Sequence, residues 1–303
     1  MNTHVPLTDL ELNDSATSGA STHGHWPAQL HLRFHRTAGN GCKLVHNRHE
    51  GPLVVQRPFY PEDGNLAHVY LLHPPGGLVS GDDLRIHLQL GEAAQVLCTT
   101  PGAGRLYRAR SDKRLQQQHC LLEVAADASL EWFPLETLAF RGAHARLTTE
   151  VKLSGTARFC GWDLIALGHV ANRVRFDDGE LTQRFRVFHD DVPVLLEQLQ
   201  LRGGNTAFAD GAAGLRGNSV SGVFLCGPYP EPVLRQFDLI ALQAALPAAL
   251  QDCCGLTRVG TFVVGRYLGD SASDARDCFI RWWEVLRPSL LQRPACKPRI
   301  WTT

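Results

Sequence analysis

The sequence has no excess of charge of either sign, no long apolar run and no targeting segment. Its 303 residues contain 30 basic and 30 acidic side chains, so the formal net charge is zero. A nucleic-acid surface needs a basic excess to displace phosphate counterions, and this composition argues against one. No apolar run approaches the roughly 20 residues that a membrane-spanning helix requires. The N-terminus also lacks the basic and apolar regions of a signal peptide, which predicts a cytoplasmic protein.

Motifs for nucleotide binding and for nucleophilic catalysis are missing as well. A P-loop places Lys and then Ser or Thr directly after its second glycine, because these side chains serve phosphate and Mg²⁺. Here the glycines Gly76, Gly77 and Gly81 are followed by Asp82. No GxSxG elbow occurs, so the strained turn that exposes a nucleophilic serine is not encoded. The sequence therefore indicates a protein that is not an enzyme of either kind.

The cysteines do not form a recognisable disulfide or metal framework. There are nine, an odd number, without a CxxC pair: Cys42, Cys98, Cys120, Cys160, Cys226, Cys253, Cys254, Cys278 and Cys296. Most lie inside apolar, strand-like runs, which is typical of buried free thiols in a reducing compartment.

The fourteen histidines all lie at or before His189, and three pairs have the spacing of metal ligands: His23/His25, His31/His35 and His46/His49. A zinc or nickel site needs such a pair together with a third or fourth fixed ligand. On a strand, His31 and His35 would share one face but lie too far apart to bind one ion. Dispersed histidines are therefore favoured over a dedicated tight site.

The order of polar and apolar residues predicts two parts. Residues 1–25 are rich in Ser, Thr, Asn, Asp and Gly without periodicity, which predicts a mobile tail. Residues 26–303 contain short β-rich runs roughly every 10 to 20 residues, which predicts a single, mainly β domain. Between the runs, Asp177-Asp178-Gly179 indicates a β-hairpin.

Helical periodicity is strong only late in the chain. Leu234 to Asp252 is apolar and contains Pro247, which should break or kink a helix there. Ser271 to Arg287 carries apolar residues on one face and begins with a weak capping box, and Pro288 is expected to end it. We therefore expect two helices near the C-terminus.

Several blocks together resemble one family. HPPGGLVSGDD and TPGAGRLYR, which flank the run Leu84 to Leu90, resemble the urease accessory protein D (UreD, also called UreH) family. So do further blocks in the same order, QRPFYPED, LEWFPLET, GWDLIALG, LLEQLQL and LRP…RPACKPRIW. The similarity covers roughly Trp26 to the C-terminus. Leu135, where the family pattern leads us to expect an amide, and the long N-terminal tail depart from it.

This resemblance implies a fold and a role. The fold implied is an elongated, β-helix-like body of stacked layers of short strands. The role implied is a scaffold in urease maturation. It would bind accessory protein F (UreF) and, through it, the GTPase accessory protein G (UreG), and would engage the urease apoprotein. No tightly bound cofactor is implied, only nickel in transit.

Carboxylates within apolar blocks are the candidate site residues. Burying an ionised carboxylate costs several kcal/mol unless it is paired or hydrated. Glu131 and Glu136, beside Trp132, pose this problem, and arginines are the simplest partners: Arg57, Arg105, Arg108 and Arg141. The alternative partner is water with a transiting cation. The resemblance assigns that second role, a nickel path, to three acids: Asp82, Asp163 and Glu197.

Two other functions stay open on the residues alone. One is a metal-dependent hydrolase that uses His and Asp ligands and would hold near-stoichiometric metal through dialysis. The other is a pure adaptor whose acids are all ion-paired. We also expect an apolar partner-binding patch, for which five tryptophans are available: Trp26, Trp132, Trp282, Trp283 and Trp301.

Overall fold

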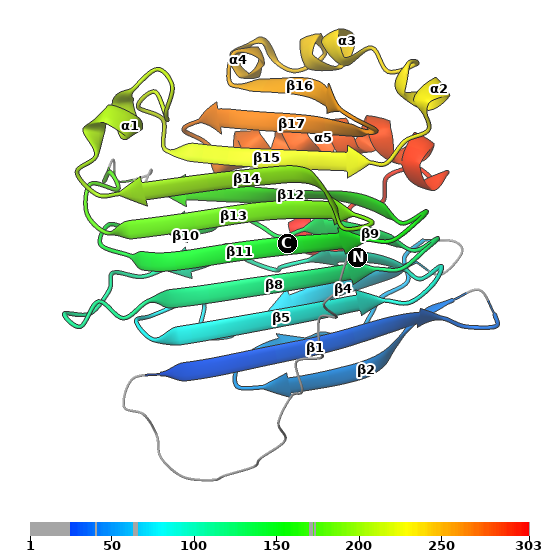
Figure 1. Cartoon of the computed structure of the whole chain (residues 1–303), viewed down its shortest axis with the longest axis horizontal. Helices are drawn as coiled ribbons and strands as arrows, with labels where there is room; N and C mark the ends of the chain where they lie inside the picture. The colour runs from blue at the N-terminus through cyan, green and yellow to red at the C-terminus, as the bar shows by residue number, and fades with distance from the viewer. Residues whose placement is uncertain (1–24, 40, 63–65, 170–171, 173, 303) are drawn as a thin grey trace, which may run out of the picture.

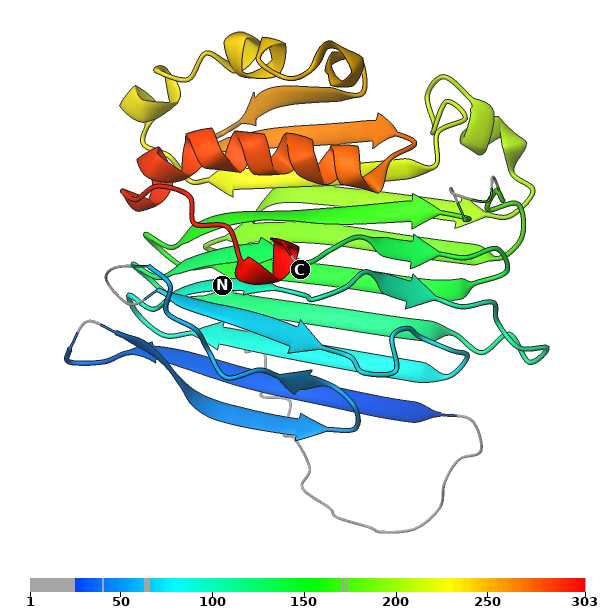
Figure 2. The ribbon, with the colours of Figure 1, turned by 180° about the vertical axis from the view of Figure 1, so that it is seen from behind.

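The computed structural model describes residues 25–39, 41–62, 66–169, 172 and 174–302. Apart from His25, the predicted N-terminal tail lies outside the described residues. Two open β-sheets stack face to face, and a long helix covers the rear one (Figures 1 and 2). The prediction of a mainly β protein is confirmed.

In the view of Figure 1, one sheet lies in front and the other behind it. The front sheet has seven strands, in spatial order β14 (Val192–Arg202), β13 (Glu180–His189), β11 (His144–Leu153), β8 (Gln116–Val124), β5 (Asp82–Leu90), β1 (Trp26–Arg36) and β2 (Cys42–Glu50). The rear sheet has ten strands: the ordered path is β16 (Cys254–Val259), β17 (Phe262–Gly269), β15 (Val220–Gly227), β12 (Arg158–Leu167), β9 (Ser129–Phe133), β6 (Gln95–Thr99), β4 (Ala67–Leu72) and β3 (Val54–Val55), with β10 (Thr137–Ala139) beside β12 and β7 (Gly104–Leu106) beside β10.

The chain winds between the sheets as a β-helix does. From β4 to β13 it passes alternately through the rear and front sheets, and neighbours within each sheet pair in parallel, as β5 does with β8 and β6 with β9. Parallel neighbours require a crossover, and here the crossover is a strand of the other sheet. The winding ends at β13, after which β14 and β15 to β17 pair antiparallel.

Burial patterns differ between the sheets because their surroundings differ. Along β5 the residues Leu84, Ile86, Leu88 and Leu90 are buried, alternating with more exposed ones, as expected for a sheet with one covered face. All five residues of β9 are buried, since the rear sheet lies between the front sheet and a helix. The continuous apolar runs of the sequence therefore mark the middle layer.

Helix α5 (Ala272–Leu291) packs on the rear sheet against β12, β15 and β17 (Figure 2). The Ser271 hydroxyl accepts from the Asp274 N–H at 3.2 Å, so the predicted N-cap is present. The expectation that Pro288 ends the helix is wrong. The helix includes Pro288 and ends at Leu291, because Leu290 and Leu291 bury their side chains in the same core.

The second predicted helix is divided into short pieces. These are α2 (Glu231–Leu234), α3 (Leu239–Ala244) and α4 (Ala248–Gln251), and α1 (Thr206–Asp210) precedes β15. The break expected at Pro247 is present, because Pro247 caps the start of α4. A 3₁₀ turn, Arg299–Thr302, follows α5. No helix in the described part of the chain is long and apolar enough to cross a bilayer.

The hairpin expected at Asp177-Asp178-Gly179 is wrong. Strand β13, which follows it, pairs with β11 and β14, so this segment links the rear sheet to the front sheet. A true hairpin joins β13 to β14 through Asp190 and Asp191, both with positive φ. Two such residues are characteristic of the type I′ turn that suits strand twist.

The expected patch of tryptophans is wrong for three of its five members. Trp132, Trp282 and Trp283 are at most 4% exposed. Apolar packing between the rear sheet and α5 takes up these rings; Phe133, for example, stacks on Trp162 with ring centroids 4.2 Å apart and meets Trp283 edge-on. Trp26, at 49% exposure, does lie on the surface.

Candidate functional site

A cavity of about 530 Å³ lies where the front sheet ends at β14 and the rear sheet continues. Its walls come from β13 and β14 of the front sheet and from β12, β15, β16 and β17 of the rear sheet. Two of the three predicted acids, Asp163 on β12 and Glu197 on β14, line this cavity. The winding therefore brings together two carboxylates that are far apart in the sequence.

Asp163 is half-buried in this wall, with an amide rather than an arginine as its partner. The Gln183 side chain on β13 donates a hydrogen bond to Asp163 Oδ1 at 2.8 Å. Burial raises the pKa of Asp163 to about 6, and the hydrogen bonds from Gln183 and from the Leu164 backbone only partly oppose this. Near neutral pH the carboxylate is therefore mostly ionised. Its two hydrogen-bond partners, the Gln183 side chain and the Leu164 backbone, are both neutral.

Glu197 stands in a different environment. The Arg266 guanidinium on β17 donates to Glu197 Oε1 through Nε, at 3.2 Å, and through Nη2. The Arg266 side chain is 51% exposed, so this pair is screened by solvent. The pair links the front sheet to the rear sheet, and both of its residues line the cavity.

Asp82 lies away from this cavity. It begins β5, and its Oδ2 accepts from the Val79 N–H at 2.8 Å, which closes the turn before the strand. Strands β8 and β11 separate β5 from β13, so at the usual spacing the two strands are about 14 Å apart. The structure therefore does not bring Asp82 into one cavity with Asp163 and Glu197.

The turn-rich blocks around Asp82 have a packing role. Leu78 and Leu106 form a bridge between the two blocks, and a side-chain carbon on Gly77 would lie 2.8 Å from the Arg105 carbonyl oxygen. The Gln116 side chain donates to the backbone oxygens of Leu78 and Tyr107. The glycines thus allow close backbone approach and do not form a phosphate cradle.

The acids beside Trp132 are ion-paired, but with other arginines than those expected from the sequence. Glu131 accepts from Arg287 of α5 at 2.9 and 2.8 Å and from the Trp283 indole at 2.6 Å. Glu136 pairs with Arg276 of the same helix. The helix, not the turn blocks, supplies the cations because it covers the rear sheet at β9, which carries Glu131, and at the segment after β9, which carries Glu136.

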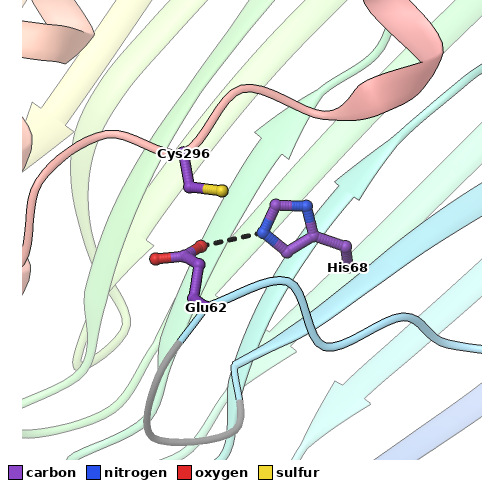
Figure 3. A group of neighbouring side chains, drawn as sticks. All are labelled: Glu62, His68 and Cys296. Atoms are coloured by element: carbon purple, nitrogen blue, oxygen red, sulfur yellow. Dashed lines mark hydrogen bonds and ion pairs between the residues drawn. The ribbon is translucent and has the colours of Figure 1, made fainter.

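Glu62, His68 and Cys296 are the one group, among the described residues, whose ligand atoms lie close enough to hold a metal ion (Figure 3). Their donors, however, are already engaged. Glu62 accepts from His68 at 2.8 Å and from Arg287 at 2.8 Å, and although burial opposes it, these bonds lower its pKa to about 2. Binding through His68 Nε2 would also place the proton on Nδ1, a buried atom with no hydrogen-bond partner. The group is better explained as part of the Arg287 ion-pair network.

Two partner residues, Gln183 and Arg287, were not predicted from the sequence, although their positions in the apolar patterns indicate that they are buried. Gln183 follows Leu181 and precedes Phe185 in the alternating pattern of β13, which places it on the inward face. Arg287 lies four residues after Trp283 and so shares the apolar face of α5. A polar residue at a core position of a regular pattern is the signal for a buried partner.

The fold and the cavity define a class of open, two-sheet β-coil proteins with acidic side chains on a cavity wall. Comparison with known proteins gives the particular family: the sequence model described as UreD urease accessory protein matches residues 27–302. The chain belongs to this family.

Relatives support this assignment over nearly the whole chain. Proteins named urease accessory protein UreD from Marinomonas sp. (strain MWYL1) and Alcanivorax borkumensis are 39% and 37% identical. The alignment covers 92% of this chain and 90% of the first, and 100% of both chains for the second. "Urease accessory protein UreD 2" of Brucella anthropi is 40% identical over 92% of this chain and 98% of its own. This membership supports a role in urease maturation.

Proposed function

We propose that this protein is a non-catalytic, cytoplasmic scaffold that gives nickel a path to the urease apoprotein. In this proposal it binds UreF and, through it, the GTPase UreG. The observation that carries the nickel path is that Asp163 and Glu197 line one cavity in a chain of the UreD family. Carboxylate oxygens attract a divalent ion but hold nickel less tightly than His or thiolate clusters, so the ion can leave.

A pure adaptor is the second candidate, and one observation favours it. Glu197 is ion-paired with Arg266, as an adaptor without a metal path requires. Asp163 favours the path, because its partner is neutral and its wall faces a cavity. The names of the relatives, all accessory proteins, favour either scaffold over a metal-dependent hydrolase.

The test replaces the three acids by amides, in a combined Asp82→Asn, Asp163→Asn, Glu197→Gln variant. Shape is retained and charge is lost, so the complex with UreF should assemble in normal yield while urease acquires several-fold less nickel. Assembly should survive because the Glu197–Arg266 pair is partly exposed, and solvent screening limits such pairs to about 0–1 kcal/mol. Yield in co-purification and nickel per urease are measured on the same preparations.

The matched control is Asp177→Asn, which removes an exposed acid outside the cavity. It should leave both quantities unchanged. Normal urease nickel in a well-assembled triple variant would end the nickel-path role of these three acids and would favour the adaptor. A scaffold role of either kind would be contradicted by a full-length chain that ignores UreF in co-purification.

A further inference from the structure

Two thiols meet beside the cavity in an arrangement that the proposed function does not use. Cys254 opens β16 and Cys278 lies in the N-terminal half of α5, and their Sγ atoms are 3.7 Å apart. Cys254 is half-buried and lines the cavity, whereas Cys278 is 0% exposed. One sulfur is therefore accessible and the other lies behind it.

The contact between these two sulfurs makes their thiols differ in acidity and therefore in reactivity. The hydrogen bond from Cys278 lowers the pKa of Cys254, although burial opposes it, and the same bond raises the pKa of Cys278. The Cys254 thiol also donates to the Leu250 carbonyl oxygen at 2.9 Å, and this bond is given up when the thiol ionises. The thiolate, not the thiol, attacks disulfides, and it forms first at the sulfur that reagents can reach. An accessible nucleophilic thiol with a second thiol in contact is the arrangement of a reversible redox site.

We propose that Cys254 and Cys278 form a reversible dithiol–disulfide site that reacts with small disulfides of the glutathione class. The Cys254 thiolate attacks one sulfur of the reagent, which releases the first small thiolate and leaves a mixed disulfide. Cys278 then loses its proton and attacks Cys254 Sγ, which releases the second. Two protein thiols are oxidised, one small disulfide is reduced to two thiols, and the two protons pass to the released thiolates.

The geometry supports closure of this bond. A disulfide is about 2.05 Å long, so each sulfur needs to move by less than about 1 Å from the observed separation. The bond would join the edge strand β16 to α5 and would reshape the cavity wall that Cys254 shares with Asp163 and Glu197. The inference does not depend on nickel transfer, since its test measures only thiol chemistry.

Two other cysteine arrangements serve as internal controls. Cys160 and Cys226 face each other across β12 and β15, but both are 0% exposed and no small disulfide can reach them. Cys253 is more accessible, and its Sγ contacts the Ala249 carbonyl oxygen rather than a second sulfur. It should therefore form a mixed disulfide and stop there.

The experiment exposes the full-length chain to oxidised glutathione near neutral pH, blocks remaining thiols with iodoacetamide and maps tryptic peptides by mass. We expect the tryptic peptides 236–258 and 277–281 to be linked by a disulfide, with a combined mass lower by two hydrogens. Dithiothreitol should reverse this cross-link. Cys254→Ser should abolish the cross-link, and Cys253→Ser should retain it. Cys278→Ala should instead leave glutathione on Cys254.

Three results would overturn the proposal. The first is that the wild-type chain shows no cross-linked peptides although Cys253 has reacted with glutathione. The second is a cross-link that persists in Cys254→Ser, which would assign the reactive sulfur to Cys253. The third is oxidation of Cys160 and Cys226 under the same conditions, which would show that the cross-link forms only in unfolded chains. The wild-type and Cys253→Ser results stand even if Cys278→Ala folds poorly.

Discussion

At the scale of single residues, buried charge is concentrated around Arg287. This guanidinium is 0% exposed and contacts the carboxylates of both Glu131 and Glu62. Burial lowers the pKa of Arg287, and the two carboxylates outweigh burial and raise it above its usual value. Each member of the network is tolerated because the others are present, so loss of one leaves an uncompensated charge.

Replacing Arg287 with Met should therefore lower the free energy of unfolding by about 3–5 kcal/mol. The side chain keeps its length, but Glu131 and Glu62 lose their shared cation. Chemical denaturation of the full chain measures the change. Arg235→Ala is the control: its pair with Glu231 is exposed and screened by solvent, so its loss should change stability little. Equal small losses in both variants would contradict a dry ion-pair network.

This network also shows what residue patterns can and cannot predict. The sequence identified Glu131 as an acid that needs a partner, because it lies between apolar residues of a strand. It did not identify Arg287, which follows 156 residues later and meets Glu131 only when α5 covers the rear sheet. Local chemistry states that a partner is needed, and the tertiary fold selects it.

At the scale of elements, α5 and the rear sheet fit each other through a glycine. A side-chain carbon on Gly265 of β17 would lie 2.3 Å from the Trp282 ring. Trp282 is 1% exposed and packs against Phe224 and Phe279. The helix and its apolar face could be predicted from periodicity. Its length past Pro288 could not, because burial of Leu290 and Leu291 decides it.

Gly265→Ala should cost about 1–3 kcal/mol of stability, because the new methyl overlaps the Trp282 ring. Trp282→Ala should cost about 3–5 kcal/mol through the cavity it leaves. The two losses should not add, since the smaller residue makes room for the methyl. Gly255→Ala, on β16 with nothing within 4 Å of the added carbon, is the control and should be near neutral. Additive losses in thermal or chemical denaturation would mean that α5 does not pack on Gly265.

At the scale of the whole molecule, a coil of strands becomes an open pair of sheets. The sequence resemblance predicted the winding, which turn signals and strand spacing alone could not, and parallel pairing from β4 to β13 confirms it. It did not predict that the winding stops at β13. That end creates the cavity, because β15 to β17 extend the rear sheet past the last front strand. The strand at which the coil ends depends on which strands pair with each other, and no local sequence pattern predicts that pairing.

The cavity at this end of the coil leads to a pH dependence. Burial raises the pKa of Asp163 from 3.8 to about 6, so the folded chain binds this proton more tightly than the unfolded chain does. Stability from this group is thus full below about pH 4 and is lost as pH rises through 6. Asp163→Asn removes the effect and should raise the free energy of unfolding at pH 7 by up to about 3 kcal/mol.

Nickel transfer should change in the opposite direction to stability. If the Asp163 carboxylate attracts the ion, nickel incorporated into urease by the purified complex should rise as pH increases through about 6, where the carboxylate ionises. Asp163→Asn should be more stable than the wild type at pH 7 and yet transfer less nickel, with no step near pH 6. Nickel per urease is measured after transfer at each pH, and the ratio of variant to wild type cancels the pH response of the other components. A ratio that stays constant across this range would remove Asp163 from the nickel path, whereas a destabilised variant would show that its charge has a cation partner.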